Sequence, residues 1–505
     1  MGIKGNAIHQ LGLMMLLTIL TQFFILIKNS LTASYFGIST ELDVFNLTTN
    51  FSNFVYSFIG AGVSTILIPY LRSRKNKYSI DIFITTIYTV AIAVLFVLIV
   101  FRRQLILLLS GSSDSYFIGI ASNIIIFTLL IGFFNSLMVL VQGILNFNDK
   151  FNGQKLILLF TTILSVILLI FIASKINIYL YAIIILITCL ISVTLHLYIV
   201  YKSGFKYKIN YDLRDSGFRE MLKVFFPTML STGVYQVSLI IDSMIASRLG
   251  TGSISILNYS NSIIVMINML FLSNLTSFIY PKLIKKGNEL ERQRSLFKYI
   301  KIINVILCLI VVLFFVGGSE GIRILYERGN FSAEDTHFVF LCTLILAIAL
   351  PSNGIRDLMY KYFYINKDSF SPFINSIFIS ILNITLSIIF SKFIGLYGVV
   401  VGTVLASYLS LLFIYIKFLK KFSMPIAKKD FNIDILKTIA ITTVSIIVSI
   451  FIKKELSIDN EYVGIVLFSF MGIFIYTVIL VILKSDVFIE FIKILSKRKY
   501  KNMIK

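Results

Sequence analysis

The sequence predicts an all-α integral membrane protein of about fourteen transmembrane helices. Three observations support this fold class. Of the 505 residues, 57% are hydrophobic and only 14% are charged, whereas charged residues make up about 25% of a typical soluble domain. Apolar runs long enough to cross a bilayer recur along the whole chain. One stretch of sequence also occurs twice, which indicates a repeated architecture.

Apolar runs separated by charged breaks define the expected helices, because about 20 apolar residues suffice to cross a bilayer. The first run, from Leu11 to Ile27, lacks a small-residue cleavage site, so we interpret it as a spanning helix and not as a signal peptide. The expected helices span residues 11–33, 44–69, 80–101, 116–146, 156–173, 178–200, 222–247, 254–280, 298–317, 337–364, 370–391, 396–417, 436–452 and 461–483.

The repeated stretch lies late in the first and seventh helices, at Lys28–Gly37 and Ile241–Gly250. An ungapped alignment places Ser30, Ala33, Ser34 and Gly37 on Ser243, Ala246, Ser247 and Gly250. A second pair of similar segments, 146–151 and 364–370, follows the fourth and tenth helices. Repeats of like orientation in transporters form two bundles that face each other across a cavity.

We therefore predict two pseudo-symmetric six-helix lobes around a central cavity. The N-terminal lobe covers residues 1–205 with helices one to six, and the C-terminal lobe covers 206–425 with helices seven to twelve. Residues 426–505 add helices thirteen and fourteen and a basic cytoplasmic tail, for which the repeat has no counterpart.

Basic residues fall mostly on one side of this topology. With the N-terminus inside, 34 of the 46 Lys and Arg residues lie in cytoplasmic segments and nine in external ones. Cytoplasmic loops of membrane proteins carry such an excess. We therefore expect a multi-pass protein of a bacterial cytoplasmic membrane with both termini in the cytoplasm. The net charge of +22 then reflects topology, and no nucleic-acid partner is expected.

The sequence contains no constellation typical of catalysis. It has no Walker-type glycine-rich loop, and no Ser-His-Asp set or pair of carboxylates converges on one segment. Cys189, Cys308 and Cys342 lie in apolar helices without metal-ligand spacing, and the three histidines are scattered. We therefore expect a protein that is not an enzyme.

The segment between the ninth and tenth helices carries a family resemblance. Residues Arg323–Thr336 read RILYERGNFSAEDT, which closely resembles the LFERGxFTxxDT-like stretch of the MurJ/MviN-type lipid II flippases. That family belongs to the superfamily of multidrug and polysaccharide exporters. The segments Phe36-Gly37, Glu41–Phe45 and Tyr362–Tyr364 are similar to other parts of the family. The resemblance covers about residues 1–420.

This resemblance implies a flippase that moves an undecaprenyl-diphosphate-linked cell-envelope glycan precursor, lipid II of peptidoglycan synthesis, across the cytoplasmic membrane by alternating access. A flippase for a capsular or O-antigen-like repeat unit is one alternative, and a cation-coupled multidrug exporter is an alternative of another class. A non-transporting scaffold of an envelope-synthesis complex is a third. The expected partners are the polyprenyl-diphosphate-linked saccharide, membrane lipids, and cell-wall or polysaccharide synthesis enzymes.

The chain departs from the family where arginines line the cavity of lipid II flippases. Lys28 stands at one such position, Asn29 stands where an aspartate is usual, and Ser262 stands where the eighth helix has an arginine. Arginine binds phosphate bidentately, whereas lysine acts as a point charge. The departures therefore keep lipid II and a capsular unit open as alternative substrates.

Four residues are predicted to contact the substrate. Lys28 and Asn29 lie late in the first helix, where an ionisable group indicates function, although a lysine near a helix end can also extend to the interface. Asp43 begins the second helix, where it either caps the helix or joins an external gate with Lys28. Arg356 lies deep in the tenth helix, where it faces either the cavity or a neighbouring helix.

The resemblance further implies four sodium ligands. Asp242 resembles the helix-seven aspartate that binds sodium in some family members, and the other ligands carry over onto Asn383, the backbone of Val399, and Thr403. A second carboxylate of that pattern aligns with Ser387 here. The alternative for Asp242 is a hydrogen bond between helices.

Overall fold

The structure is a computed structural model, and it is built from helices. It describes residues 2–71, 77–111, 114–148, 150–273, 275–276, 279, 283–284, 288–366, 368–422, 428–456 and 460–483. These residues are almost entirely helical and include no strand, which confirms the predicted all-α class.

Packing divides the chain into two compact units. The first comprises Met1–Asn258 and the short segment Arg328–Ser332, and the second comprises Tyr259–Glu327 and Ala333–Lys505. These units describe which residues pack together. The predicted lobes, 1–205 and 206–425, rest on repeated sequence, and they stay a prediction.

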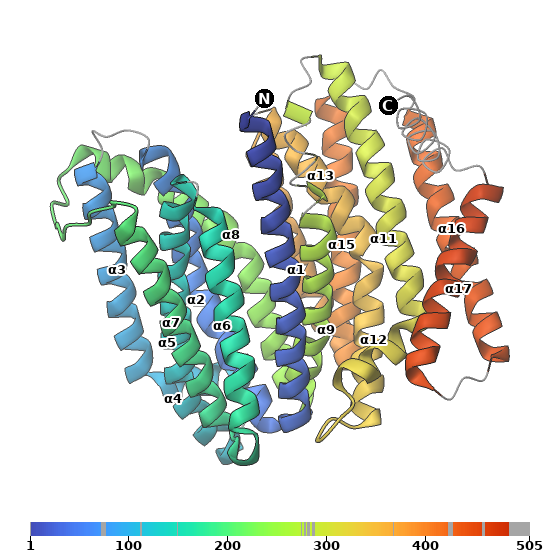
Figure 1. Cartoon of the computed structure of the whole chain (residues 1–505), viewed down its shortest axis with the longest axis horizontal. Helices are drawn as coiled ribbons and strands as arrows, with labels where there is room; N and C mark the ends of the chain where they lie inside the picture. Colours follow the sequence, from blue (N-terminus) through green and yellow to red (C-terminus); the bar gives the residue numbers. More distant parts are fainter. Residues whose placement is uncertain are drawn as a thin grey trace. The chain divides into compact units, whose positions relative to one another are not determined.

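The first unit holds the helices up to the first turns of α9, and they run alongside one another in Figure 1. Their bounds are α1 (Gly2–Phe36), α2 (Thr40–Leu71), α3 (Lys77–Val100), α4 (Arg102–Ser110), α5 (Ser115–Phe147), α6 (Phe151–Phe171), the 3-10 turn η2 (Ala173–Lys175), α7 (Ile178–Lys202), α8 (Ser216–Ser247) and α9 (Ser253–Ile267).

Several helix starts in this unit are fixed by the residue just before them. Asp114, Asn177 and Asp215 each accept a hydrogen bond from a backbone N–H in the first turn of α5, α7 and α8. Side-chain oxygens at this position satisfy N–H groups that have no partner within the helix. These caps explain why apolar runs begin as helices at these points.

An aromatic cluster joins α1, α2 and α7 in the first unit. The ring of Tyr181 on α7 packs edge-on against Phe36 and Phe45, with centroid distances of 5.5 and 4.9 Å. Its hydroxyl accepts a hydrogen bond from Thr32 on α1 at 3.4 Å. Edge-to-face pairs of this kind stabilise a core beyond the burial of their area. The end of α1 is therefore held against α2 and α7.

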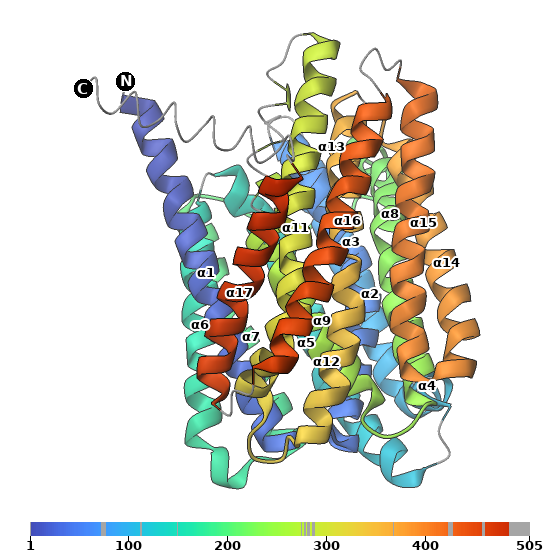
Figure 2. The same cartoon turned by 90° about the vertical axis from the view of Figure 1, so that its right-hand side faces the viewer.

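The second unit is built around the long helix α11, which packs against α16 and α17 (Figure 2). A buried cluster that includes Val312, Phe468 and Tyr476 joins these helices. Their bounds are the π-helical turn η3 (Asn268–Ser273), α11 (Glu289–Tyr326), α12 (Ala333–Ile348), α13 (Leu350–Ile365), α14 (Phe370–Ile394), α15 (Leu396–Lys421), α16 (Lys428–Glu455) and α17 (Glu461–Ile482).

Each expected helix has a counterpart in the structure, with differences of detail. The expected helix at 254–280 is α9 followed by the π-helical turn η3, and its residues 274, 277, 278 and 280 lie outside the described residues. The expected helix at 337–364 is broken at Ala349 into α12 and α13, because Pro351 cannot continue the backbone ladder. The nine-residue helix α4 was not expected. Twelve helices within the described residues are long and apolar enough to cross a membrane. The count of fourteen stays a prediction, because it includes α2 and α8, whose side chains are described only in part.

The two copies of the first repeated stretch share a buried alanine and a glycine with positive φ. Ala33 and Ala246 are fully buried, near the ends of α1 and α8. A glycine with positive φ follows each helix: Gly37 comes directly after α1 with a φ of 56°, and Gly250 comes three residues after the end of α8 with a φ of 127°. Residues other than glycine rarely adopt this conformation. The shared burial and backbone support the alignment of the two stretches.

Candidate functional site: charged groups, an oxygen cluster and an apolar groove

Lys28 is a cation without a partner in the described part of the chain. It is partly buried on α1, and its backbone carbonyl accepts a hydrogen bond from Thr32 at 2.9 Å. Its ammonium group forms no hydrogen bond or ion pair with any described residue. Neighbouring Asn29 is also partly buried. A half-buried charge without a partner is costly, so Lys28 is available to an anionic ligand.

The carboxylate of Asp43, a residue of α2, accepts hydrogen bonds from the start of another helix, α9. It lies in the first turn of α2 and is only 3% exposed. One carboxylate oxygen accepts the backbone N–H of Gly252 at 2.5 Å, and the other accepts the N–H and the hydroxyl of Ser255 at 2.7 and 2.6 Å. Asp43 therefore caps the N-terminus of α9, where the helix dipole favours a negative charge. Lys28 is not among these partners, and the predicted substrate contact of Asp43 stays a prediction.

The loop of the family segment packs on the end of α1. The backbone N–H of Asn330 donates to the carbonyl of Ser34 at 2.9 Å, and its side-chain amide donates to the carbonyl of Tyr35 at 2.6 Å. Gly37 and Gly329 both have positive φ, and a Cβ at either would lie 2.2–2.3 Å from a backbone oxygen across the contact. The close approach therefore requires glycine at both positions.

Three of the predicted sodium ligands meet between α14 and α15. Thr403 donates its hydroxyl to the carbonyl of Val399 at 3.1 Å and to the side-chain oxygen of Asn383 at 3.4 Å. Ser387 donates to the same Asn383 oxygen at 2.8 Å and to the Val399 carbonyl at 3.3 Å. Gly402 allows this approach, because a Cβ there would lie 2.6 Å from the backbone nitrogen of Ser387.

Asp242, the fourth predicted ligand, lies on α8 in the first unit and is 9% exposed. It belongs to the repeated stretch, next to Ser243, which accepts a hydrogen bond from Asn50 of α2 at 2.9 Å. The structure therefore brings together Asn383, Val399 and Thr403. The role of Asp242 stays a prediction.

Arg356 is a second buried cation. It lies on α13 in the second unit, where it is partly buried. Its Nη1 nitrogen is buried and has no hydrogen-bond partner in the described part of the chain. A buried guanidinium nitrogen without an acceptor is uncommon. This observation supports the prediction that Arg356 meets an anionic group.

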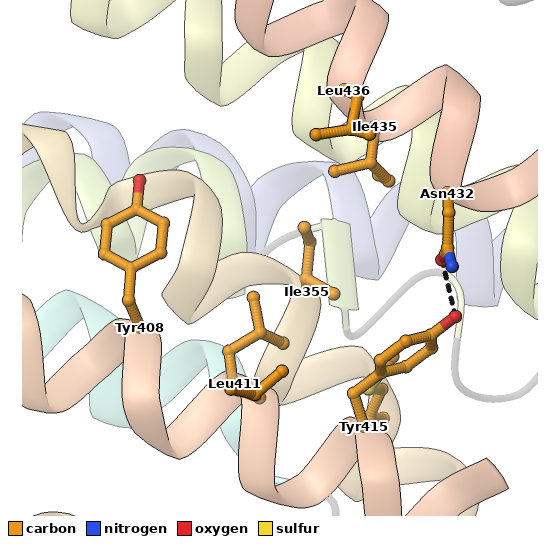
Figure 3. Close-up of a pocket in the computed structure, with 9 residues that line it drawn as sticks. Ile355, Tyr408, Leu411, Tyr415, Asn432, Ile435 and Leu436 are labelled. Carbon is orange, nitrogen blue, oxygen red and sulfur yellow. Dashed lines mark hydrogen bonds between the residues drawn. The ribbon is translucent and has the colours of Figure 1, made fainter.

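An apolar groove crosses the second unit between α11, α13, α15 and α16. It consists of two adjoining cavities of about 420 and 450 Å³, which share Ile355, Tyr408, Leu411 and Ile435. At one end, the Tyr415 hydroxyl donates to the Asn432 side chain at 2.6 Å (Figure 3). The remaining walls are mostly aliphatic and aromatic, with Asn304, Ser352, Thr442 and Thr443 as the polar residues among them, so the groove fits a hydrocarbon chain better than a charged ligand.

Comparison with known proteins identifies the family. The model of the family described as "Lipid II flippase MurJ" matches residues 32–494. The chain belongs to the lipid II flippase MurJ family. A protein of Rickettsia prowazekii named "Probable lipid II flippase MurJ" is 26% identical over 421 residues, which cover 79% of this chain and 81% of the relative.

Solved structures agree on the fold of this MurJ family member. A structure titled "Lipid II flippase MurJ, inward closed conformation" superposes with a TM-score of 0.81 at 24% identity, covering 94% of this chain and 99% of that one. An inward-facing multidrug transporter of the MATE family gives a TM-score of 0.63 at 18% identity, covering 79% of this chain and 96% of that one. The predicted fold class and family are confirmed.

Sequence reasoning missed the partners of the predicted residues. Gly252 and Ser255 follow directly after the second repeated stretch, but nothing in their spacing points to Asp43, which lies about 210 residues earlier. Asn330 was part of the family segment, yet its contact with α1 depends on tertiary structure. The sequence predicts no sodium ligand at Ser387, because it stands where the family pattern has a carboxylate. In the structure, its hydroxyl belongs to the oxygen cluster.

Proposed function

We propose that this MurJ family member moves lipid II, a polyprenyl-diphosphate-linked saccharide, across the bacterial cytoplasmic membrane, with both termini in the cytoplasm. The observation that carries this proposal is the family match over residues 32–494. It favours lipid II over a capsular unit and over a drug. The chain then acts as a transporter that alternates its access between the two sides of the membrane, and it is not an enzyme.

In this proposal, Lys28 of the first unit binds the diphosphate, and Arg356 of the second unit is a separate candidate contact for an anionic group. Both side chains are partly buried. The Lys28 ammonium group and the Nη1 nitrogen of Arg356 have no partner among the described residues. Moving a diphosphate through a low-dielectric region requires opposite charge to offset its desolvation. Asn29, next to Lys28, offers an amide to the same head group. Asp43, as the cap of α9, holds the first turns of α2 and α9 together.

The apolar groove of the second unit holds the polyprenyl chain in this proposal. Its walls at Leu412 and Leu436 are 53% and 64% exposed, so the cavity that they line is open to the outside. An isoprenoid chain would bury these side chains, which the hydrophobic effect favours. Cell-wall synthesis enzymes that supply or use lipid II are the protein partners that the proposal implies.

Sodium coupling is a further part of the proposal. The Asn383 side chain, the Val399 carbonyl and the hydroxyls of Thr403 and Ser387 form a set of neutral oxygens within one cluster. Oxygen donors of this kind suit a hard cation, and transporters use backbone carbonyls in the same way. Asp242 lies on α8 of the first unit, and its part in sodium binding stays a prediction. Sodium bound there would take the place of the hydrogen bonds that now join these oxygens.

The test uses cells depleted of their resident lipid II flippase. The proposal expects that the chain restores lipid II to the outer face of the membrane, and that a polyprenyl-linked capsular unit appears there more slowly. If only the capsular unit appears, the substrate assignment is wrong. If neither lipid appears although the protein is in the membrane, the transport proposal is wrong.

A further inference from the structure

A polar, aromatic pocket lies at one end of the first unit. It has a volume of about 490 Å³ and is lined by residues from four separate segments, all within that unit. These segments are the α1–α2 turn, the start of α5, the turn before α7, and the loop that carries Asn330. All four are external in the predicted topology. Pockets of about 300–1,000 Å³ typically hold small molecules.

Three tyrosine rings give the pocket flat apolar walls. Tyr35 is the next-to-last residue of α1, and Tyr116 and Tyr179 are the second residues of α5 and α7. The Tyr35 hydroxyl donates to the backbone of Leu169, which fixes its ring at the pocket wall. Tyr179 makes no hydrogen bond with the described residues, and its ring is partly buried. Rings of this kind combine an apolar face with a polar edge.

The polar groups between the rings are a carboxylate and two carboxamides. One oxygen of Glu41 accepts the Tyr116 hydroxyl at 2.7 Å, which leaves the other oxygen without a partner in the described part of the chain. Asn177 uses its oxygen to cap α7, so its amide nitrogen remains a donor. Asn330 uses its amide nitrogen on Tyr35, so its oxygen remains an acceptor. The pocket therefore presents both donors and acceptors.

The charge of the pocket excludes a phosphate ligand. The structure describes every residue that lines the pocket, and Glu41 is the one charged residue among them. An anion would meet this carboxylate without a compensating cation, which is unfavourable. A neutral sugar ring meets no such penalty. Its C–H face can lie on a tyrosine ring, and its hydroxyls can donate to Glu41 and accept from Asn177.

We propose that this pocket binds a neutral sugar ring on the external side of the membrane. This inference rests on the proposed function and deepens it, because the pocket would receive a sugar of the lipid-linked head group after translocation. The Asn330 loop joins the pocket to the end of α1, the helix that carries Lys28. A sugar in the pocket would then lie at the end of α1, and the diphosphate would lie against Lys28, earlier in the same helix.

The test measures binding of a soluble sugar to the purified full-length protein in nanodiscs. The probe is methyl N-acetyl-β-glucosaminide, followed by saturation-transfer NMR, with glucose 1-phosphate as the anionic comparison. We expect transfer to the neutral sugar at millimolar concentration and about tenfold weaker binding in Glu41→Gln and in Tyr179→Ala, since each loses a principal contact. Tyr179→Phe keeps the ring and should keep most of the binding.

Matched controls lie in the second unit. Glu455 and Tyr462 are exposed, so Glu455→Gln and Tyr462→Ala should bind like the wild type. The inference is overturned if Glu41→Gln and Tyr179→Ala bind the sugar as well as these controls do, or if glucose 1-phosphate binds as tightly as the neutral sugar. Folding of each variant is checked from its melting temperature.

The result separates the pocket from the transport proposal. Lipid II flipping without sugar binding would remove only the inference about the pocket. Sugar binding that depends on Glu41 and Tyr179, without any flipping, would leave the pocket and remove the proposed function. A free sugar that binds equally well with or without added lipid II would show that the pocket is not filled by the lipid-linked head group.

Discussion

Replacing Asp43 with asparagine should destabilise the first unit by removing the cap of α9. The carboxylate accepts three hydrogen bonds, one from Gly252 and two from Ser255. An asparagine oxygen can keep the two from Ser255, but its NH₂ group then faces the N–H of Gly252. A buried donor left unpaired costs about 1–3 kcal/mol, and the lost charge at the helix N-terminus costs about 0.3–1 kcal/mol more.

These costs sum to about 1.3–4 kcal/mol, which corresponds to a fall in melting temperature of roughly 3–16 °C for a unit of this size. The chain offers a direct readout, because Cys189, Cys308 and Cys342 are all buried and free. In a Cys308→Ala, Cys342→Ala background, a thiol-reactive dye reports only the exposure of Cys189, which lies in the first unit.

Two further variants calibrate the measurement. Ser255→Ala removes one hydroxyl hydrogen bond and should cost about 1 kcal/mol. Glu41→Gln changes a carboxylate in the same turn of α2, but that carboxylate accepts one hydrogen bond, from the exposed Tyr116. It should melt within about 2 °C of the parent protein. The reasoning is refuted if Asp43→Asn melts no lower than Glu41→Gln.

Three other predictions follow from the charged groups. In cells depleted of the resident flippase, Lys28→Ala and Lys28→Gln should abolish lipid II flipping, whereas Lys28→Arg should keep a useful fraction; full activity of Lys28→Gln would show that the lysine only extends to the interface. Sodium should raise the melting temperature relative to potassium at matched ionic strength. Thr403→Val and Asp242→Asn should lose this rise, and Thr385→Val, an exposed threonine of α14, should keep it; no sodium effect on the wild type would remove the coupling proposal. Asp368 is buried, which alone would raise its pKa, but hydrogen bonds from Lys421 and Ser371 lower the pKa to about 2. The stability that the ionised Asp368 contributes is therefore complete above its ordinary pKa near 3.8 and is lost as the pH falls toward 2. The difference in melting temperature between wild type and Asp368→Asn should shrink over that pH range. A constant difference would contradict the lowered pKa of Asp368.

Sequence periodicity was enough to place the helices, because a membrane-spanning helix must be apolar over about 20 residues. The repeated stretch also predicted local structure, since Ala33 and Ala246 are both buried and Gly37 and Gly250 both adopt positive φ. The break between α12 and α13 was missed. Its cause, Pro351, lies inside an apolar run that otherwise resembles one continuous helix.

The candidate site was predicted less completely, because its contacts join residues that are distant in sequence. Family resemblance supplied Asn383, Val399 and Thr403, and the structure places them in one cluster. Asp43 was expected to cap its own helix or join a gate, but its oxygens bind the start of α9 instead. Nothing local to Asp43 encodes this partner, since the hydrogen bonds depend on how α2, α8 and α9 pack.

The most direct test of the central claim is the rate at which the purified protein moves lipid II in reconstituted vesicles. A fluorescent lipid II is placed in one leaflet, and its arrival in the other leaflet is followed by quenching. We expect transfer by the wild type well above that of empty vesicles, with loss of transfer in Lys28→Gln at unchanged protein content. Wild-type transfer no faster than in empty vesicles, while a polyprenyl-linked capsular unit is moved under the same conditions, would contradict it.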